Sequence, residues 1–260
     1  MALPVLRAGP AAAADIPAIL AFYERHAPRG LFYPRDAGWI RTRLGGNAFA
    51  FYAARTDEEL AGCVWVAERP EFVFLEIRDG ALVLRREGPF FESGGMLVAP
   101  RFRAMGVGEL LTATCHAFWF IWRQGPDPAP PMWARVKGAR ARNGDPLFWS
   151  LVGEPVTGLP YAALLEAPFE SPEREIAARW PHRPIPLGEL PPDVRARALG
   201  KAEETHAPFE TRLCSYGFER TERYNVRSLN AFLRCSRETV RAPQTFPFRT
   251  SINWHAERPA

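Results

Sequence analysis

The sequence has few cysteines, and none of them are grouped. Its 260 residues contain four, at Cys63, Cys115, Cys214 and Cys235, and no Cys-x-x-Cys motif occurs. Closely spaced cysteines are typical of structural zinc sites, and dense ones cross-link small secreted domains. We therefore expect neither a metal site nor disulfides, and we expect the protein to work in a reducing cytoplasm.

Long apolar runs and clusters of basic residues are also missing. No stretch approaches the roughly 20 apolar residues that span a bilayer. Pro10, Asp15 and Pro17 interrupt the alanine-rich N-terminus where the apolar core of a signal peptide would lie. The net charge is only +4 and the arginines are scattered, whereas nucleic-acid-binding proteins cluster basic residues. We expect no membrane or nucleic-acid partner, and the mild positive charge suits a small anionic ligand.

Proline is abundant, with 26 residues, and this excludes an architecture of long helices. Apolar patterning between the prolines predicts short strands and helices, and hence an α/β protein with a mixed sheet covered by helices. We expect strands over 5–8, 48–54, 60–68, 72–77, 81–86, 90–99, 132–137 and 222–232. We expect helices over 16–23, 36–44, 109–124, 146–152, 161–167, 170–180, 190–199 and 205–216. The length allows two domains, which we place at 1–168 and 169–260.

One stretch carries a recognisable chemical pattern. The apolar run Met96–Ala99 predicts a buried strand that Pro100 ends, and an uninterrupted run after Gly108 predicts a helix. Between them, Arg103 to Gly108 spell Arg-x-x-Gly-x-Gly. The first N–H groups of a helix lack intrahelical partners and lie at the positive end of its dipole, so they bind anions. The pattern predicts a pyrophosphate site, although an ordinary tight strand–helix connection remains an alternative.

This motif resembles the acyl-CoA loop of the GNAT N-acyltransferase superfamily. Further pieces occur in an order that resembles the bacterial arginine N-succinyltransferase family: Gly30-Leu31 with Pro34, Glu92, Pro100 to Arg103, Phe148-Trp149 with Leu151 and Gly153, Pro184-Ile185, Ala207-Pro208 and Gly217-Phe218. The resemblance implies a GNAT-like, largely antiparallel sheet flanked by helices, with a C-terminal extension or second lobe. It also implies transfer of an acyl group from succinyl-CoA or acetyl-CoA to the amine of a small amino-acid-like substrate. The sequence leaves open whether the protein forms a homo-oligomer.

The resemblance also assigns site residues. The strand backbone at Met96, Leu97 and Val98 is expected to bind the pantetheine arm of the acyl-CoA. The pyrophosphate is expected on Arg103, Ala104, Met105, Gly106, Val107 and Gly108. Glu92 matches the position of a general base, with a surface or salt-bridged residue as the alternative. Glu203 aligns with the family's proton-donor histidine, and His206, about one helical turn later, competes with Glu203 for that role.

Two departures from the family favour a second hypothesis. Arg135 stands where the family has a glutamate, so a cation would face a guanidinium substrate if this position lined the pocket. Glu203 replaces the expected histidine. These changes favour a catalytically degenerate subunit that binds CoA or a partner without turnover, whereas the intact glycine loop favours an enzyme.

Overall fold

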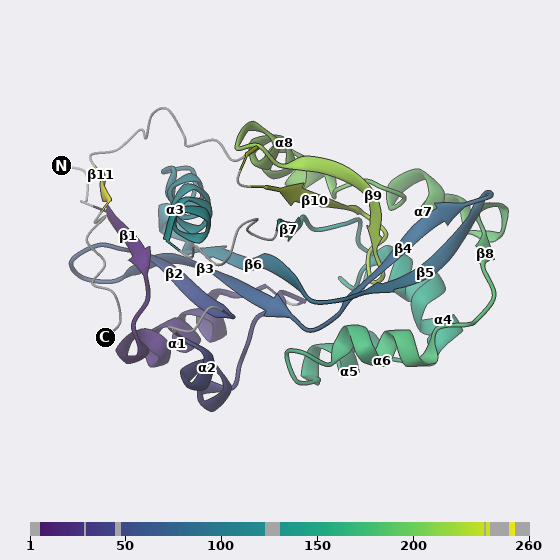
Figure 1. Cartoon of the computed structure of the whole chain (residues 1–260), viewed down its shortest axis with the longest axis horizontal. Coiled ribbons are helices and arrows are strands. Elements are labelled where there is room, and N and C mark those ends of the chain that lie inside the picture. Colours follow the sequence, from purple (N-terminus) through teal and green to yellow (C-terminus); the bar gives the residue numbers. More distant parts are fainter. Residues whose placement is uncertain are drawn as a thin grey trace. The chain divides into compact units, whose positions relative to one another are not determined.

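The computed structural model describes residues 6–28, 30–44, 48–122, 131–236, 238–239 and 250–252, and only the backbone of 116–122 and 250–252. Contacts divide the chain into two compact units (Figure 1). Unit 1 comprises 1–68, 92–130 and 236–260, and unit 2 comprises 69–91 and 131–235. The two units are therefore interleaved in sequence, whereas the sequence analysis expects two consecutive segments, 1–168 and 169–260.

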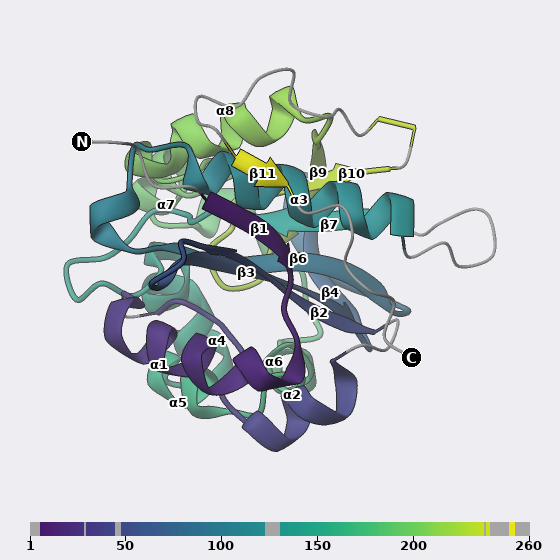
Figure 2. The same cartoon turned by 90° about the vertical axis from the view of Figure 1, so that its left-hand side faces the viewer.

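Unit 1 is a sheet covered by helices on both faces. Its strands are β1 (Leu6–Pro10), β2 (Phe49–Arg55), β3 (Leu60–Arg69), β6 (Phe90–Val98) and β11 (Thr250–Ile252), in the order β11-β1-β2-β3-β6. Its helices are α1 (Ile16–His26), α2 (Ala37–Arg43) and α3 (Val107–Trp122). Strand β1 runs parallel to β11 and antiparallel to β2, which is antiparallel to β3. Helix α3 covers one face and α1 and α2 the other (Figure 2).

Local sequence explains the helices of unit 1. Asp36 caps α2, because its Oδ1 accepts hydrogen bonds from the N–H groups of Gly38 (2.7 Å) and Trp39 (3.0 Å). Pro17 lies in the first turn of α1, where a missing N–H costs nothing. The buried face of α1 consists of Ile16, Ile19, Phe22 and Tyr23, at helical spacing.

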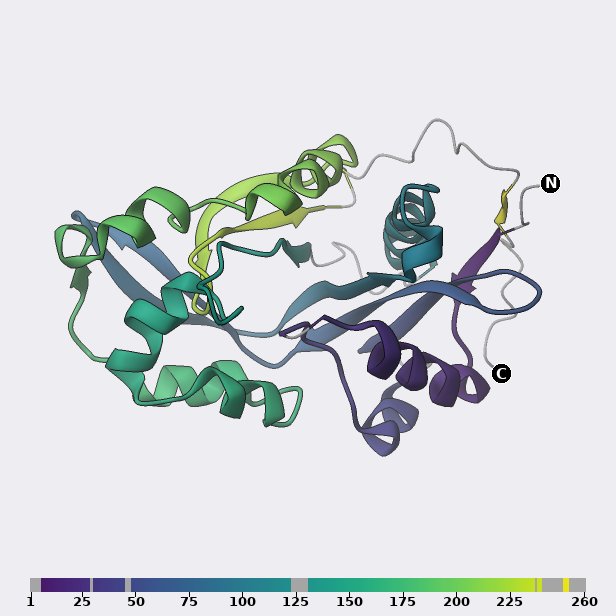
Figure 3. The same cartoon turned by 180° about the vertical axis from the view of Figure 1, so that it is seen from behind.

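Unit 2 is an antiparallel sheet with helices on both sides (Figure 3). Its strands are β4 (Phe72–Arg78), β5 (Ala81–Glu87), β7 (Met132–Arg135), β8 (Ile185–Pro186), β9 (Glu219–Asn225) and β10 (Ala231–Cys235), in the order β7-β10-β9-β4-β5-β8. Its helices are α4 (Glu154–Thr157), α5 (Tyr161–Glu166), α6 (Pro172–Arg179), α7 (Pro192–Arg197) and α8 (Ala207–Ser215). Helices α5 and α6 lie on one side of the sheet and α8 on the other.

One expected strand of unit 2 is wrong, and one expected helix has different bounds. The single strand over 222–232 is instead the end of β9, a turn and the start of β10. Asn225 makes that turn, because its Oδ1 accepts the N–H of Arg227 (2.8 Å) while Leu229 takes a left-handed φ of 60°. The helix expected over 146–152 is present and longer: it begins at Leu147, forms a π-helical turn at Trp149–Gly153 and continues into α4.

The remaining elements support the sequence-based fold class. The other expected strands and helices are present, with boundaries that differ by a few residues. The sheets are mixed and largely antiparallel and the helices flank them, as predicted. None of the helices in the described residues has the length and apolarity that crossing a membrane requires.

Candidate functional site

The predicted strand–turn–helix unit is present between β6 and α3. Beyond β6, the N–H of Ala99 bonds to the carbonyl of Ala61 (2.9 Å), and residues Pro100–Phe102 form a 3-10 turn. Ala104 and Gly106 then adopt left-handed φ values of 61° and 80°. An alanine rarely takes this conformation, which costs about 1–2 kcal/mol. The backbone between β6 and α3 is thus a strained turn, and α3 begins directly after it.

The main-chain N–H groups of this turn fall into two sets. Those of Arg103 and Met105 bond back to the carbonyls of Pro100 (3.2 Å) and Phe102 (3.3 Å). Within the described part of the chain, the N–H groups of Ala104, Gly106, Val107 and Gly108 make no hydrogen bond. The start of α3 therefore offers four main-chain donors at the positive end of a helix dipole.

The side chains around these donors leave the turn open. Arg103 is exposed, and its Nε donates to the carbonyl of Val98 (3.3 Å) at the end of β6. A Cβ atom at Gly108 would lie 3.8 Å from the Sδ of Met96 and 3.9 Å from Val98, which is ordinary contact. Neither packing nor backbone strain thus requires glycine at 108.

Glu92 lies in β6, in unit 1, with only 1% of its surface exposed. The surface alternative considered for it is therefore wrong. Fully buried glutamates are uncommon and are usually paired or functional.

Glu203 and His206 come together in unit 2, as their spacing predicted. The Nδ1 of His206 lies 3.4 Å from Oε2 of Glu203 and 2.9 Å from the hydroxyl of Thr205. Arg140 contacts the same carboxylate, with its Nε 3.7 Å from Oε2. Partial burial lowers the pKa of His206 below 6.5, and the cations Lys137 and Arg140 lower it further, against the opposing effect of Glu203. His206 is thus a mostly neutral imidazole at pH 7.

Arg135 belongs to a buried cluster of charged residues that no sequence pattern predicted. Glu173 on α6 contacts the guanidinium groups of Arg69 (2.7 Å), Arg227 (3.1 Å) and Arg135 (3.2 Å). Burial alone would raise the pKa of Glu173, but the three arginines outweigh it and hold that pKa well below its usual range. The cation at 135 is therefore partly neutralised inside unit 2. The four residues lie far apart in the sequence, and no local pattern links them.

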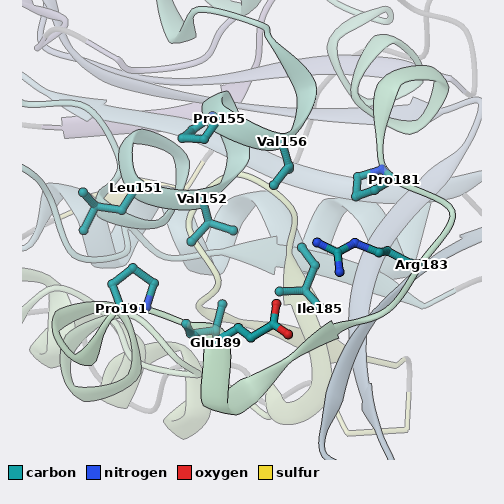
Figure 4. Close-up of a pocket in the computed structure, with 10 residues that line it drawn as sticks. Leu151, Val152, Pro155, Val156, Pro181, Arg183, Ile185, Glu189 and Pro191 are labelled. Atoms are coloured by element: carbon teal, nitrogen blue, oxygen red, sulfur yellow. The ribbon is translucent and has the colours of Figure 1, made fainter.

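A surface pocket in unit 2 contains none of the predicted site residues (Figure 4). It has a volume of about 400 Å³ and lies between the α4 region and the segment that includes β8. Its lining is mostly apolar: Leu151, Val152, Pro155, Val156, Pro181, Arg183, Ile185, Glu189, Leu190 and Pro191. Among the described residues, no group of three or more His, Cys, Asp and Glu side chains is placed to hold a metal ion.

Comparisons with known proteins give matches of structure but not of sequence. No protein-family model matches the chain, and no curated protein matches it. The structure of arginine/ornithine succinyltransferase subunit AI from Pseudomonas aeruginosa matches with a TM-score of 0.66 and 18% identity, covering 92% of this chain and 79% of that one.

Smaller acetyltransferases match part of the chain. One is an aminoglycoside acetyltransferase from an uncultured soil metagenomic sample, in complex with sisomicin, with a TM-score of 0.34 and 15% identity over 52% of this chain and 78% of that one. Another is a putative acetyltransferase of the GNAT family from Desulfovibrio desulfuricans, with a TM-score of 0.35 and 17% identity over 52% of this chain and 76% of that one. The match at a TM-score of 0.66 shows that the chain shares the fold of the arginine/ornithine succinyltransferase subunit, the GNAT-like fold that the sequence predicted.

Proposed function

We propose that the chain is an acyl-CoA-dependent N-acyltransferase that acts on the amine of a small amino-acid-like molecule. The observation that carries this proposal is the set of four N–H donors at Ala104, Gly106, Val107 and Gly108, which make no hydrogen bond within the described residues. Such donors, aligned with the dipole of the 16-residue helix α3, suit a pyrophosphate group. The fold shared with a protein named as a succinyltransferase also supports an acyltransferase.

The residues that we propose to bind acyl-CoA all belong to unit 1. The pyrophosphate of acyl-CoA binds the turn before α3, and exposed Arg103 adds a cation at its rim. The pantetheine arm runs along the backbone of Met96, Leu97 and Val98, and one of these N–H groups polarises the thioester carbonyl. The acyl group is succinyl or acetyl.

The chemical step is a direct attack of the amine on the thioester. Glu92 takes a proton from the ammonium group of the acceptor, the C–N bond forms, and the C–S bond breaks to release CoA as a thiol. Glu92 is proposed for this role because its side chain is buried on β6, the strand that also carries Met96 to Val98. The proton that the nitrogen loses as the amide forms goes to the leaving thiolate. The sequence-based candidates for a proton donor, Glu203 and His206, belong to unit 2, where Oε2 of Glu203 lies 3.4 Å from the Nδ1 of His206.

The proposal is tested by measuring thiol release from acetyl-CoA and succinyl-CoA with a panel of amines that includes arginine, ornithine, other amino acids and polyamines. We expect thiol release that depends on one class of amine. Calorimetric titration with CoA and with pantetheine separates binding from turnover. Because pantetheine lacks the pyrophosphate, it should bind far more weakly than CoA.

Three results have different meanings. Tight CoA binding without thiol release from any pair would favour the degenerate CoA-binding subunit. Equal affinity for CoA and pantetheine would contradict the pyrophosphate site. No binding of either would overturn the transferase proposal.

A further inference from the structure

Strand β6 changes its backbone conformation immediately before the proposed pantetheine-binding residues. Gly95 has a φ of +60°, whereas an extended strand residue has a φ near −120°. A left-handed glycine inside a strand redirects the next peptide group. In β6 that group carries the N–H of Met96, so the conformation of Gly95 determines how Met96 to Val98 present their backbone.

The indole of Trp65, on β3, supports this change of direction from one side. A Cβ atom at Gly94 would lie 2.5 Å from the Trp65 ring, and one at Gly95 would lie 2.2 Å from its Nε1. The Nε1 itself donates to the carbonyl of Phe32 (3.4 Å). The ring thus packs directly on the two-glycine backbone, and no side chain larger than hydrogen fits at either position.

Tyr23 of α1 supplies the polar contact. Its hydroxyl donates to the carbonyl of Gly95 at 2.6 Å, and its ring, which is fully buried, stacks on Tyr33 with centroids 4.2 Å apart and planes 8° from parallel. Burial raises the pKa of Tyr23, with Cys63 adding to the shift, so the hydroxyl keeps the proton that it donates. A partly buried carbonyl that loses its donor is destabilised, so this bond favours the observed peptide orientation.

We propose that Tyr23 is a positioning residue for acyl-CoA, acting through the Gly95 carbonyl on the backbone of Met96–Val98. This inference rests on the proposed function, because Tyr23 can position acyl-CoA only if acyl-CoA binds along β6. The bond fixes one peptide orientation before the ligand arrives, so binding of the pantetheine arm does not have to order this backbone. Tyr23 contacts no reacting atom.

The test compares the whole chain with its Tyr23→Phe variant, which keeps the stacked ring and removes only the hydroxyl. We expect the Kd for CoA and the KM for acyl-CoA to rise about tenfold, the effect of one lost hydrogen bond of ordinary strength. The KM for the acceptor amine should stay unchanged. Hydrogen–deuterium exchange should speed up in peptides covering Met96–Val98, which a purely global loss of stability would not do selectively. Tyr161→Phe, another buried tyrosine but in unit 2, is the control for loss of a hydroxyl.

Each outcome separates this inference from the proposed function. If the unmodified chain binds CoA and the variant binds it equally well, with unchanged exchange at Met96–Val98, the positioning role is overturned and the transferase proposal stands. An equal rise in the KM for acyl-CoA and the KM for the amine, with faster exchange throughout the chain, would mean that Tyr23 acts only on overall stability. That result would also overturn the inference. If the unmodified chain binds no CoA, the proposed function fails and the role of Tyr23 fails with it.

Discussion

Removing the charge of Glu173 should be among the most damaging single changes in unit 2. This carboxylate lies 2.7 to 3.2 Å from three guanidinium groups, those of Arg69, Arg135 and Arg227. Glu173, Arg69 and Arg227 are each at least 93% buried. Glu173→Gln keeps the shape of the side chain but leaves these cations without that negative charge in a place where water cannot replace it.

The size of the effect follows from that burial. Breaking a buried ion pair by removing one partner costs about 3–5 kcal/mol, because the remaining charge stays desolvated. Glu173 serves three arginines, so we expect a loss at the upper end of this range. Natural domains have a total free energy of unfolding of about 5–15 kcal/mol. The variant should therefore unfold at much lower urea concentration or fail to fold.

Urea unfolding followed by circular dichroism measures the loss, with Glu87→Gln as the matched control. Glu87 also pairs with an arginine, Arg223, at 2.6 Å, but both side chains are substantially exposed. Its replacement should change the free energy of unfolding by less than about 1 kcal/mol. A loss below about 1 kcal/mol for Glu173→Gln, with an unchanged denaturant slope, would refute the reasoning.

The same cluster predicts how stability depends on pH. The folded-state pKa of Glu173 lies below its ordinary value of 4.5, so the unfolded chain binds this proton more readily. The stabilising contribution is therefore complete above pH 4.5 and decreases as the pH falls below it. The difference in stability between the unmodified chain and Glu173→Gln should shrink in acid, and an undiminished difference well below that pH would contradict the assignment.

Three further predictions concern the candidate site. Glu92→Gln should lower turnover by about a hundredfold or more with the fold retained, as for loss of a general base; unchanged kinetics would reject that role. Gly106→Ala should lower the free energy of unfolding by about 1–2 kcal/mol and weaken CoA binding, because its φ of 80° strains an alanine. Gly108→Ala is the control and should change stability by less than about 0.5 kcal/mol, since its Cβ fits. His206 should titrate below pH 6.5 by NMR, so acidification through pH 6.5 should destabilise the fold as the unfolded histidine takes up its proton; a midpoint at or above 6.5 would be inconsistent with its surroundings.

Local patterns were sufficient wherever neighbours along the chain decide the structure. The strand over 90–99, the glycine turn and the following helix were predicted because proline, glycine and apolar periodicity act within a few residues. The contact between Glu203 and His206 followed from a separation of three residues in a helical turn. The break at Asn225 was missed, since 222–232 contains neither glycine nor proline and the turn depends on an asparagine side chain and a left-handed leucine.

Only the tertiary structure decided which distant residues meet. The sequence separates Arg69, Arg135, Glu173 and Arg227 by up to 158 positions, and their association in one buried cluster comes from packing within unit 2. The same holds for Tyr23, whose hydroxyl meets the Gly95 carbonyl 72 residues away. The sequence by itself determined the strand, the glycine turn and the helix start of the proposed acyl-CoA site. These depend on backbone sterics and on the free N–H groups of a helix terminus, and neither requires contact with a distant part of the chain. The burial of Glu92 and the contacts of Trp65 and Tyr23 with β6 could not be predicted from the sequence. Burial and long-range hydrogen bonds exist only once separate elements pack together.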